Sequence, residues 1–265
     1  MVRWWRGAVV AGAMVVAFCA SSVSGQEFGL KKKRPKPHEY GNVVMNNASQ
    51  GGKVAPVVFN HWLHRARYTC RLCHVDIGFG MRAGQTEVRE ADNINGLYCG
   101  ACHDGKEAFG REGVNAAGAR IQNCDLCHSQ GKDVSFKVDF YEFKKPFPQE
   151  RFGNGIDWLK AEEQRLVTLK DFLPGVSIER NRLKAPETFA VAPKEANMPE
   201  IIFSHQKHTV WSGCELCHPE IFGVKKGSQP YSMQEIFAGR YCGVCHGKVA
   251  FPNNDCQRCH TREVQ

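Results

Sequence analysis

Residues 59–74 read Phe-Asn-His-Trp-Leu-His-Arg-Ala-Arg-Tyr-Thr-Cys-Arg-Leu-Cys-His, and the last five of them form the pattern Cys-x-x-Cys-His. This pattern is the attachment signature of covalently bound haem, because two thiols three positions apart can each form a thioether to one vinyl group of the porphyrin. The histidine that follows is then held under the iron as its proximal ligand. The stretch therefore predicts a polypeptide built around haem.

The same five-residue pattern occurs six times along the chain. Its cysteines, which we predict to bind the cofactor, are Cys70, Cys73, Cys99, Cys102, Cys124, Cys127, Cys214, Cys217, Cys242, Cys245, Cys256 and Cys259. Its histidines, which we predict to be the proximal iron ligands, are His74, His103, His128, His218, His246 and His260. Of the 13 cysteines in the chain only Cys19 lies outside the pattern, so we predict six covalently attached haem c groups.

Three other uses of paired cysteines explain the pattern less well. Zinc ribbons combine two Cys-x-x-Cys units around one metal, and their chemistry requires no histidine after every second cysteine. A disulfide framework suits an exported protein but does not explain the histidines either. A thioredoxin-like redox site needs a strand-helix-strand pattern around a single motif, and the sequence shows none.

The first 25 residues are typical of a secretory signal peptide, with Arg3 and Arg6 ahead of an apolar stretch and small residues after it. We therefore expect a periplasmic or exported protein, the compartment in which bacteria attach haem c. An uncleaved membrane anchor and a lipid on Cys19 are alternatives, although Phe18 is a poor fit to a lipidation site. Residues 26–52 form a basic arm whose lysine-rich start is either solvated or docks to an acidic partner or an anionic surface.

Charge and size restrict the other possibilities. The formal net charge of +8 would be offset by the propionates of the haems, so we expect no nucleic-acid partner. About 40 residues would remain for each haem, too few for an ordinary apolar core around so many cofactors. We therefore expect the porphyrins to supply the buried surface, giving a haem-filled core.

The chain contains an internal duplication. Residues 59–64 and the motif at Cys70 recur as residues 203–208 and the motif at Cys214, with the same spacing of nine residues from the first histidine to the first cysteine. Residues 98–109 recur as residues 241–251, and a third motif closes each half. We predict two tandem triheme modules, module 1 at residues 53–132 and module 2 at residues 197–265.

Secondary structure is expected to be sparse, mainly irregular with short α-helices. The apolar triads at residues 57–59 and 201–203 each predict a short extended segment. Residues 133–196 form a connector without cysteine, in which residues 157–169 predict one helix that stops before Pro174 and Gly175. We assign no function to this connector from its sequence.

The Phe-x-His-x-x-His element ahead of three haem motifs resembles the class III c-type cytochromes, the cytochrome c3 and triheme cytochrome c7 group. The resemblance covers both modules and not the connector. It implies that His61 and His205 are the distal ligands of the haems on Cys70/Cys73 and Cys214/Cys217. It further implies that His64 and His208 serve the haems on Cys99/Cys102 and Cys242/Cys245.

The chain departs from this family at the third haem of each module. Triheme relatives carry another histidine just before the second motif, where this chain has residues 95–98 and 238–241 without one. Of the 11 histidines only His38 is left, so at least one iron needs another ligand or an open position. We predict Met233 for the haem on Cys256/Cys259, with gap-filling in a core as its alternative. For the haem on Cys124/Cys127 the candidates are His38, Met81 and Met45.

These features predict an electron carrier rather than an enzyme, passing single electrons between redox partner proteins such as other cytochromes or a membrane quinol oxidoreductase. Peripheral association with a membrane is compatible with the basic arm. The alternatives are a multihaem reductase of a small oxyanion that keeps one iron five-coordinate, and a haem subunit of a membrane electron-transfer complex or filament.

Overall fold

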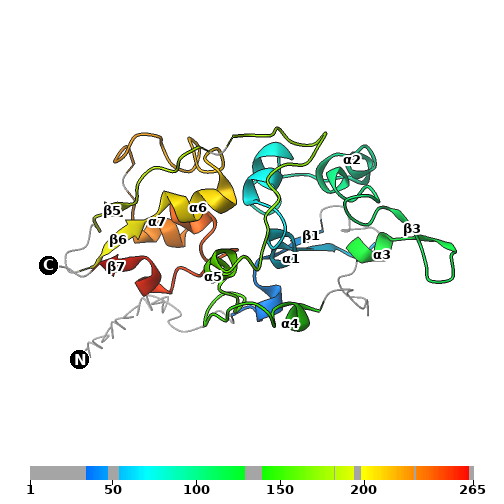
Figure 1. Ribbon diagram of the computed structural model, residues 1–265, viewed down its shortest axis with the longest axis horizontal. Coiled ribbons are helices and arrows are strands. Elements are labelled where there is room, and N and C mark those ends of the chain that lie inside the picture. The colour runs from blue at the N-terminus through cyan, green and yellow to red at the C-terminus, as the bar shows by residue number, and fades with distance from the viewer. Residues whose placement is uncertain are drawn as a thin grey trace, which may run out of the picture. The chain divides into compact units, whose positions relative to one another are not determined.

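The structure, a computed structural model, describes residues 34–46, 54–128, 139–181, 183–193, 198–229 and 231–262 (Figure 1). The predicted signal segment 1–25 and the lysine-rich start of the arm lie outside these residues. The described chain from Pro35 onward forms one compact unit. None of the helices within the described ranges has the length and apolar character needed to cross a membrane.

Each module opens with an antiparallel pair of strands followed by a helix that carries the two distal-ligand candidates. In module 1, strand β1 (Asn42–Met45) pairs with β2 (Val57–Asn60), and helix α1 (His61–Arg65) follows directly. In module 2, β5 (Phe189–Val191) pairs with β6 (Glu200–Phe203), and α6 (His205–Ser212) follows. The predicted extended segments at residues 57–59 and 201–203 are confirmed.

The partner strands β1 and β5 were not foreseen. They come from segments that the sequence assigned to the arm and the connector, and each lies against the first strand of its module. Val43 stands opposite Phe59, and Phe189 opposite Phe203, so the two hairpins are built alike. Strand β7 (His260–Arg262) adds to β6 in module 2, while the residues that follow His128 in module 1 lie outside the described ranges.

The remaining elements are short, as the predicted fold class requires, because turns rich in glycine separate the haem motifs. Those in module 1 and its arm are η1 (Pro37–Glu39), η2 (Leu72–Asp76), α2 (Glu90–Ile94), η3 (Tyr98–Ala101), β3 (Glu112–Val114), β4 (Arg120–Gln122) and α3 (Cys124–Cys127). Those in the connector and module 2 are α4 (Phe140–Phe143), α5 (Trp158–Glu163), α7 (Met233–Phe237), η4 (Tyr241–Val244) and η5 (Cys256–Arg258).

The predicted connector helix is shorter than the sequence indicated. Asp157 caps α5 by accepting a hydrogen bond from the Lys160 amide, but the helix ends at Glu163 rather than near Leu169. Arg165 adopts a left-handed conformation with φ of 57°, and the amides of Arg165 and Leu166 donate back to the carbonyls of Glu162 and Ala161. This is a Schellman termination, which ends a helix regardless of the apolar spacing beyond it.

The connector builds an aromatic core of its own. Its buried members are Phe140, Phe147, Ile156, Trp158, Ala161 and Val167 of the connector, together with Trp62 of α1. Trp211 of α6 packs against this cluster from module 2. The expectation that porphyrins alone supply the buried surface was therefore incomplete, since the connector adds a conventional hydrophobic centre beside the haem motifs.

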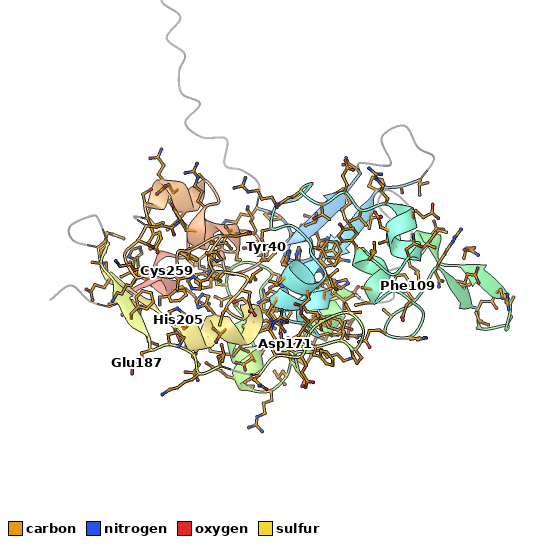
Figure 2. All side chains as sticks on the ribbon, turned by 90° about the horizontal axis from the view of Figure 1, so that it is seen from above. Tyr40, Phe109, Asp171, Glu187, His205 and Cys259 are labelled. Carbon is orange, nitrogen blue, oxygen red and sulfur yellow. The ribbon has the colours of Figure 1, made fainter. Side chains whose placement is uncertain are left out.

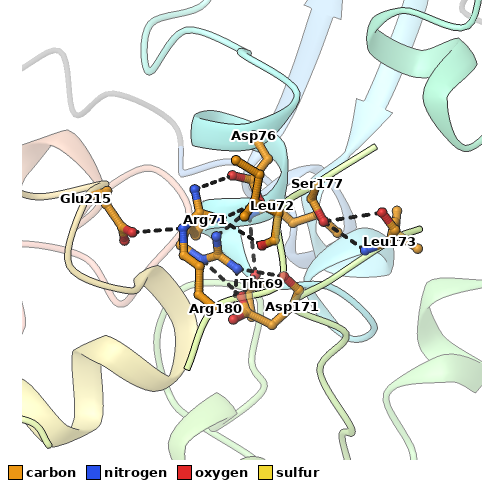
Figure 3. A network of polar contacts seen from close by, with 10 residues as sticks. Thr69, Arg71, Leu72, Asp76, Asp171, Leu173, Ser177, Arg180 and Glu215 are labelled. Carbon is orange, nitrogen blue, oxygen red and sulfur yellow. Dashed lines mark hydrogen bonds and ion pairs between the residues drawn. The ribbon is translucent and has the colours of Figure 1, made fainter. Parts of the chain in front are cut away.

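A network of ion pairs joins the connector to both modules (Figure 3). Buried Arg71 of module 1 contacts Asp76 at 3.1 Å and Asp171 of the connector at 2.9 Å. Arg180 of the connector contacts the same Asp76 at 2.9 Å and Glu215 of module 2 at 3.0 Å. Arg71 and Glu215 occupy the same position of their motifs, directly after the first cysteine, so the connector links equivalent sites of the two modules.

Candidate haem sites

The haem motifs fold as single turns of helix, which explains their spacing. In the motifs at Cys99, Cys124, Cys214 and Cys242 the histidine amide donates to the carbonyl of the first cysteine, four residues earlier. Side chains three and four positions apart lie on the same face of such a turn. Both thiols and the imidazole of a motif therefore face the same side, as a porphyrin bound through all three requires.

All six motif histidines are held by a backbone carbonyl through the ring nitrogen Nδ1. The accepting carbonyls belong to Phe79, Phe109, Ala55, Phe222, Phe251 and Pro199, in the order of the histidines, at distances of 2.8–3.1 Å. A carbonyl only accepts hydrogen bonds, so each Nδ1 carries the proton and each Nε2 presents a lone pair. This tautomer is the one that binds a metal through Nε2.

The carbonyl acceptors repeat between the modules. Ala55 and Pro199, which orient the histidines of the two third motifs, each lie four residues before the phenylalanine that opens the Phe-x-His-x-x-His element. The segment that leads into β2 or β6 thus holds the histidine of the last motif of its module. Sequence reasoning missed these acceptors because a backbone carbonyl leaves no residue-type signal.

Three pairs of histidines face one another at nearly the same separation. The ring centres are 6.4 Å apart for His61 and His74, 6.3 Å for His64 and His103, and 6.3 Å for His208 and His246. A metal–imidazole bond of about 2 Å on each side, with each ring centre roughly 1 Å beyond its nitrogen, places two axial rings about 6 Å apart. Each pair thus leaves the space that one iron needs.

The distal members of these pairs are held in the same tautomer, again by a hydrogen bond from Nδ1 to a backbone carbonyl. His61 donates from Nδ1 to the carbonyl of Gly41 at 2.5 Å, His64 to Asn60 at 3.0 Å, and His208 to Ser204 at 2.8 Å. Burial lowers the pKa of His61 and of His246 to about 4, against the opposing effect of their carbonyl partners. Both rings are therefore neutral at neutral pH, which is the form that ligates iron.

The fourth distal candidate is placed differently. The ring of His205 contacts Phe189 at 5.4 Å and Phe203 at 5.0 Å, and its buried Nδ1 has no hydrogen-bond partner within the described chain. The ring contacts found in the described residues do not include one between His205 and His218. This site therefore shares its sequence pattern with His61 but lacks the carbonyl that fixes the ring.

The second motif of each module requires a glycine and an unusual tyrosine. Tyr98 and Tyr241 have φ of 48° and 50°, a left-handed conformation that is rare outside glycine. A Cβ atom on Gly100 would lie 1.9 Å from the carbonyl oxygen of Asn93, and one on Gly243 1.9 Å from that of Ile236. The close contact with the end of α2 or α7 explains why Tyr-Cys-Gly occurs in both modules.

The candidates for the two remaining iron ligands lie in separate places. Met233 begins α7 and is 38% exposed. This exposure leaves its side chain accessible to a bound haem. Met45 ends β1 opposite Val57, and Met81 is half-buried. His38 lies in η1 with Nδ1 3.1 Å from the hydroxyl of Tyr141 and Nε2 3.7 Å from Glu39, so its observed contacts are with the arm and the connector. These assignments stay predictions.

The thiols themselves fit covalent haem. All twelve motif cysteines are free rather than paired in disulfides, and burial raises the pKa of most of them, to about 12 for Cys73 and Cys245. Within the described ranges no three His, Cys, Asp or Glu side chains gather as an inorganic metal site would require. Unpaired thiols are free to form thioethers with porphyrin vinyl groups, and the imidazoles held beside them present Nε2 as an iron ligand.

Comparison with known proteins gives a consistent result. Residues 57–129 and 201–261, just over half of the chain, match the family described as cytochrome c7 and related cytochrome c. The two matched segments coincide closely with the two modules. No curated protein is similar enough to count as a match.

Several solved structures are also similar in sequence. The C-terminal hexaheme fragment of GSU1996 is 27% identical over 83% of this chain and 97% of its own, with a TM-score of 0.26. A c7-type three-heme cytochrome domain is 34% identical over 29% of this chain and 95% of its own, with a TM-score of 0.27. The dodecaheme cytochrome c GSU1996 is 24% identical over 83% of this chain and 73% of its own, with a TM-score of 0.27.

Proposed function

Because this chain belongs to the family of cytochrome c7 and related cytochromes c, we propose that it is a hexahaem electron carrier built from two triheme modules. Members of this family bind haem c, and a multihaem cytochrome transfers electrons to and from redox partners. We also propose that there are six haems, assign both axial ligands to five of the irons, and name the compartment in which the protein meets its redox partners.

The observation that carries the proposal is the set of three histidine pairs at 6.3–6.4 Å. An electron carrier benefits from iron with two protein ligands, because a filled sixth position leaves little rearrangement on reduction and no place for a substrate. The pairs supply both ligands for the haems on Cys70/Cys73, Cys99/Cys102 and Cys242/Cys245. His205 opposite His218 would complete the haem on Cys214/Cys217.

The chain's own residues position the cofactors and set their electronics. The carbonyl of Gly41 and the carbonyls that hold the proximal histidines fix each ring and increase its basicity. Bound haem supplies the one-electron chemistry. The polypeptide contributes ligand identity, burial and local charge, which are the quantities that shift a haem potential.

Met233 is proposed as the sixth ligand of the haem on Cys256/Cys259. A thioether ligand raises the reduction potential relative to a second imidazole, so this haem would be the high-potential site of module 2. A potentiometric titration of Met233→His tests the assignment, because the highest-potential component should then move down. An unchanged titration would remove Met233 from the ligand set, and the same substitution at Met81 provides the comparison for module 1.

A reductase of a small oxyanion is the second candidate, favoured by the shortage of distal histidines at the third motif of each module. Such an enzyme needs one five-coordinate iron, which gives a high-spin ferric signal in electron paramagnetic resonance. A substantial high-spin signal that shifts with nitrite or sulfite would support this candidate. A spectrum of low-spin species alone, unaffected by either anion, would support the carrier.

We also propose that the protein is exported and works in the periplasm or at the cell exterior, on the basis of residues 1–25 and of the haem motifs. Its partners would be other cytochromes or a membrane quinol oxidoreductase, with the basic arm contacting an acidic or anionic surface. Fractionation of cells that express the full chain tests this, because haem-stained protein should appear outside the cytoplasm and without residues 1–25.

The decisive measurement for the function is the intact mass of the purified protein together with its visible spectrum after reduction. We expect six haem masses above the mass of the polypeptide and a sharp alpha band. A colourless product at the mass of its amino acids would overturn the proposal. If the mass shows fewer than six haems, peptide mapping would identify which motif carries none.

A further inference from the structure

Three parts of the chain meet around one half-buried arginine, whose Nε is fully covered. Arg65, the last residue of α1 in module 1, places its guanidinium carbon 4.5 Å from the ring centre of Trp158 in the connector. The same carbon lies 4.8 Å from the ring centre of Trp211 in α6 of module 2. The two indole rings stand nearly perpendicular, at 83°, and enclose the cation between them. Such a cation–π arrangement holds a desolvated charge in place.

The polar atoms of Arg65 are only partly used. One terminal nitrogen donates to the carbonyl of Val249 in module 2 at 2.6 Å, while the buried Nε has no partner within the described chain. No carboxylate among the ion pairs of the described residues neutralises it, in contrast to Arg71, which is paired with Asp76 and Asp171. The charge of Arg65 is therefore half-buried and has no carboxylate partner within the described residues.

The surroundings of Arg65 belong to two different predicted haems. In module 1, Arg65 ends α1, the helix that begins with His61, the distal candidate for the first haem. In module 2, Val249, whose carbonyl accepts from Arg65, donates its own amide to the carbonyl of Cys245, which belongs to the second motif. A Cβ atom on Gly41, whose carbonyl holds His61, would lie 3.6 Å from Val249. The arginine thus lies where the two modules bring one haem each together.

We propose that Arg65 is a fixed positive charge shared by the haems on Cys70/Cys73 and Cys242/Cys245, and that it raises the reduction potential of both. This inference rests on the proposed function. Each haem gains one electron on reduction, and no bond forms or breaks. Its net charge therefore falls by one. A cation held beside it stabilises the reduced form, and burial between two indoles keeps water and salt from screening the effect.

The location gives the charge a functional consequence. If the reduction potentials of one haem in each module are raised, electrons would favour these two haems, and so the part of the molecule where the modules meet. The connector's role follows from this arrangement. Trp158 of the connector contacts Arg65, and the ion pairs of Asp171 and Arg180 link the connector to both modules (Figure 3).

The test uses the full haem-loaded protein and four variants. Arg65→Gln and Arg65→Met remove the charge, and the Met side chain keeps the volume between the indoles. Arg65→Lys keeps the charge, and Arg120→Gln removes an equal charge from the exposed strand β4. Intact mass first confirms that each variant carries the same number of haems as the parent protein. NMR-monitored potentiometric titration then follows the oxidised fraction of each haem through its methyl signals.

We expect the neutral variants to lower the reduced-to-oxidised ratio of two haems by about tenfold at a fixed potential, which corresponds to 59 mV for a one-electron couple. Arg65→Lys should keep both ratios within about threefold of the parent, and Arg120→Gln should move neither. A purely structural clamp would lower thermal stability in the neutral variants and leave the titration unchanged, which would overturn the proposal. Movement of the same two haems in Arg120→Gln would overturn it as well.

Should both neutral variants lose haem, Arg65→Lys remains decisive. With the charge retained and the guanidinium fork removed, a shift as large as tenfold would show that geometry rather than charge sets the two potentials. If the parent protein itself carried fewer than six haems, in contrast, that result would contradict the proposed function and not the role of Arg65.

Discussion

The two modules share their haem chemistry and differ where they meet the connector. Both carry the Phe-x-His-x-x-His helix, the Tyr-Cys-Gly turn and the carbonyl that orients the last motif histidine. In module 1, Trp62 between the two distal histidines is buried in the aromatic core, whereas the equivalent Gln206 in module 2 is exposed. Repetition thus preserves what the cofactor requires, and divergence marks the surface that joins the halves.

Figure 2 shows His205 of module 2 and Phe109 of module 1 far apart, with Tyr40 and Asp171 between them.

The largest expected difference is at the position between the distal histidines. Trp62→Ala should lower the free energy of unfolding by about 3–5 kcal/mol, because it leaves a cavity beside Trp158 and Phe140. Gln206→Ala, its matched control, should change that free energy by less than about 0.5 kcal/mol. Denaturant unfolding of the haem-loaded protein measures both. Equal losses would mean that the connector core does not distinguish the modules.

A second difference is expected at the residue after the first motif cysteine. Arg71→Ala should cost about 3 kcal/mol, because Asp76 is buried and loses one of its two cations. Glu215→Ala at the equivalent position should cost no more than about 1 kcal/mol, because that ion pair is half exposed. The same unfolding measurement applies. A larger loss for Glu215→Ala would locate the main link between connector and modules at module 2 instead.

The next prediction concerns what the modules share. Gly100→Ala and Gly243→Ala should each cost about 1–3 kcal/mol and to a similar extent, because each added Cβ meets a helix-end carbonyl that has no room to move. Thermal unfolding followed through the haem absorbance reports the loss. A cost confined to one variant would contradict the equivalence of the two Tyr-Cys-Gly turns.

The smallest expected effect separates His61 from His205. A hydrogen bond such as that from His61 to Gly41 contributes about 1 kcal/mol, and Nδ1 of His205 has none within the described residues. Added imidazole should therefore displace the distal ligand of the haem on Cys214/Cys217 about fivefold more readily than that on Cys70/Cys73. Titration of the oxidised protein, followed by its spectrum, measures the two affinities.

Two variants identify the sites in that titration. His205→Ala should remove the most easily displaced component and leave the others in place, while His61→Ala should leave it unchanged. Loss of that component in His61→Ala, with none in His205→Ala, would reverse the assignment.

The haem motifs, the duplication and the scarcity of regular structure were predictable because they depend on local chemistry. A thioether needs a cysteine at a fixed spacing, and the Cys-x-x-Cys-His turn brings thiols and imidazole to one face whatever surrounds it. The distal pairs of His61, His64 and His208 were inferred from a family resemblance, and the structure places each ring opposite a motif histidine. The end of α5 was misjudged, because the turn at Arg165 depends on backbone conformation and not on apolar spacing.

The amino-acid sequence by itself determined the six Cys-x-x-Cys-His motifs and so the predicted points of haem attachment, since covalent bonding and one helical turn involve only neighbouring residues. Only the tertiary structure decided that Gly41, Ala55 and Pro199 orient ligand histidines and that the connector forms an aromatic core. The same holds for Arg65, which lies between the modules beside Trp158 and Trp211. These contacts join residues far apart along the chain through backbone carbonyls, ring faces and buried charge, none of which leaves a pattern in the order of residues.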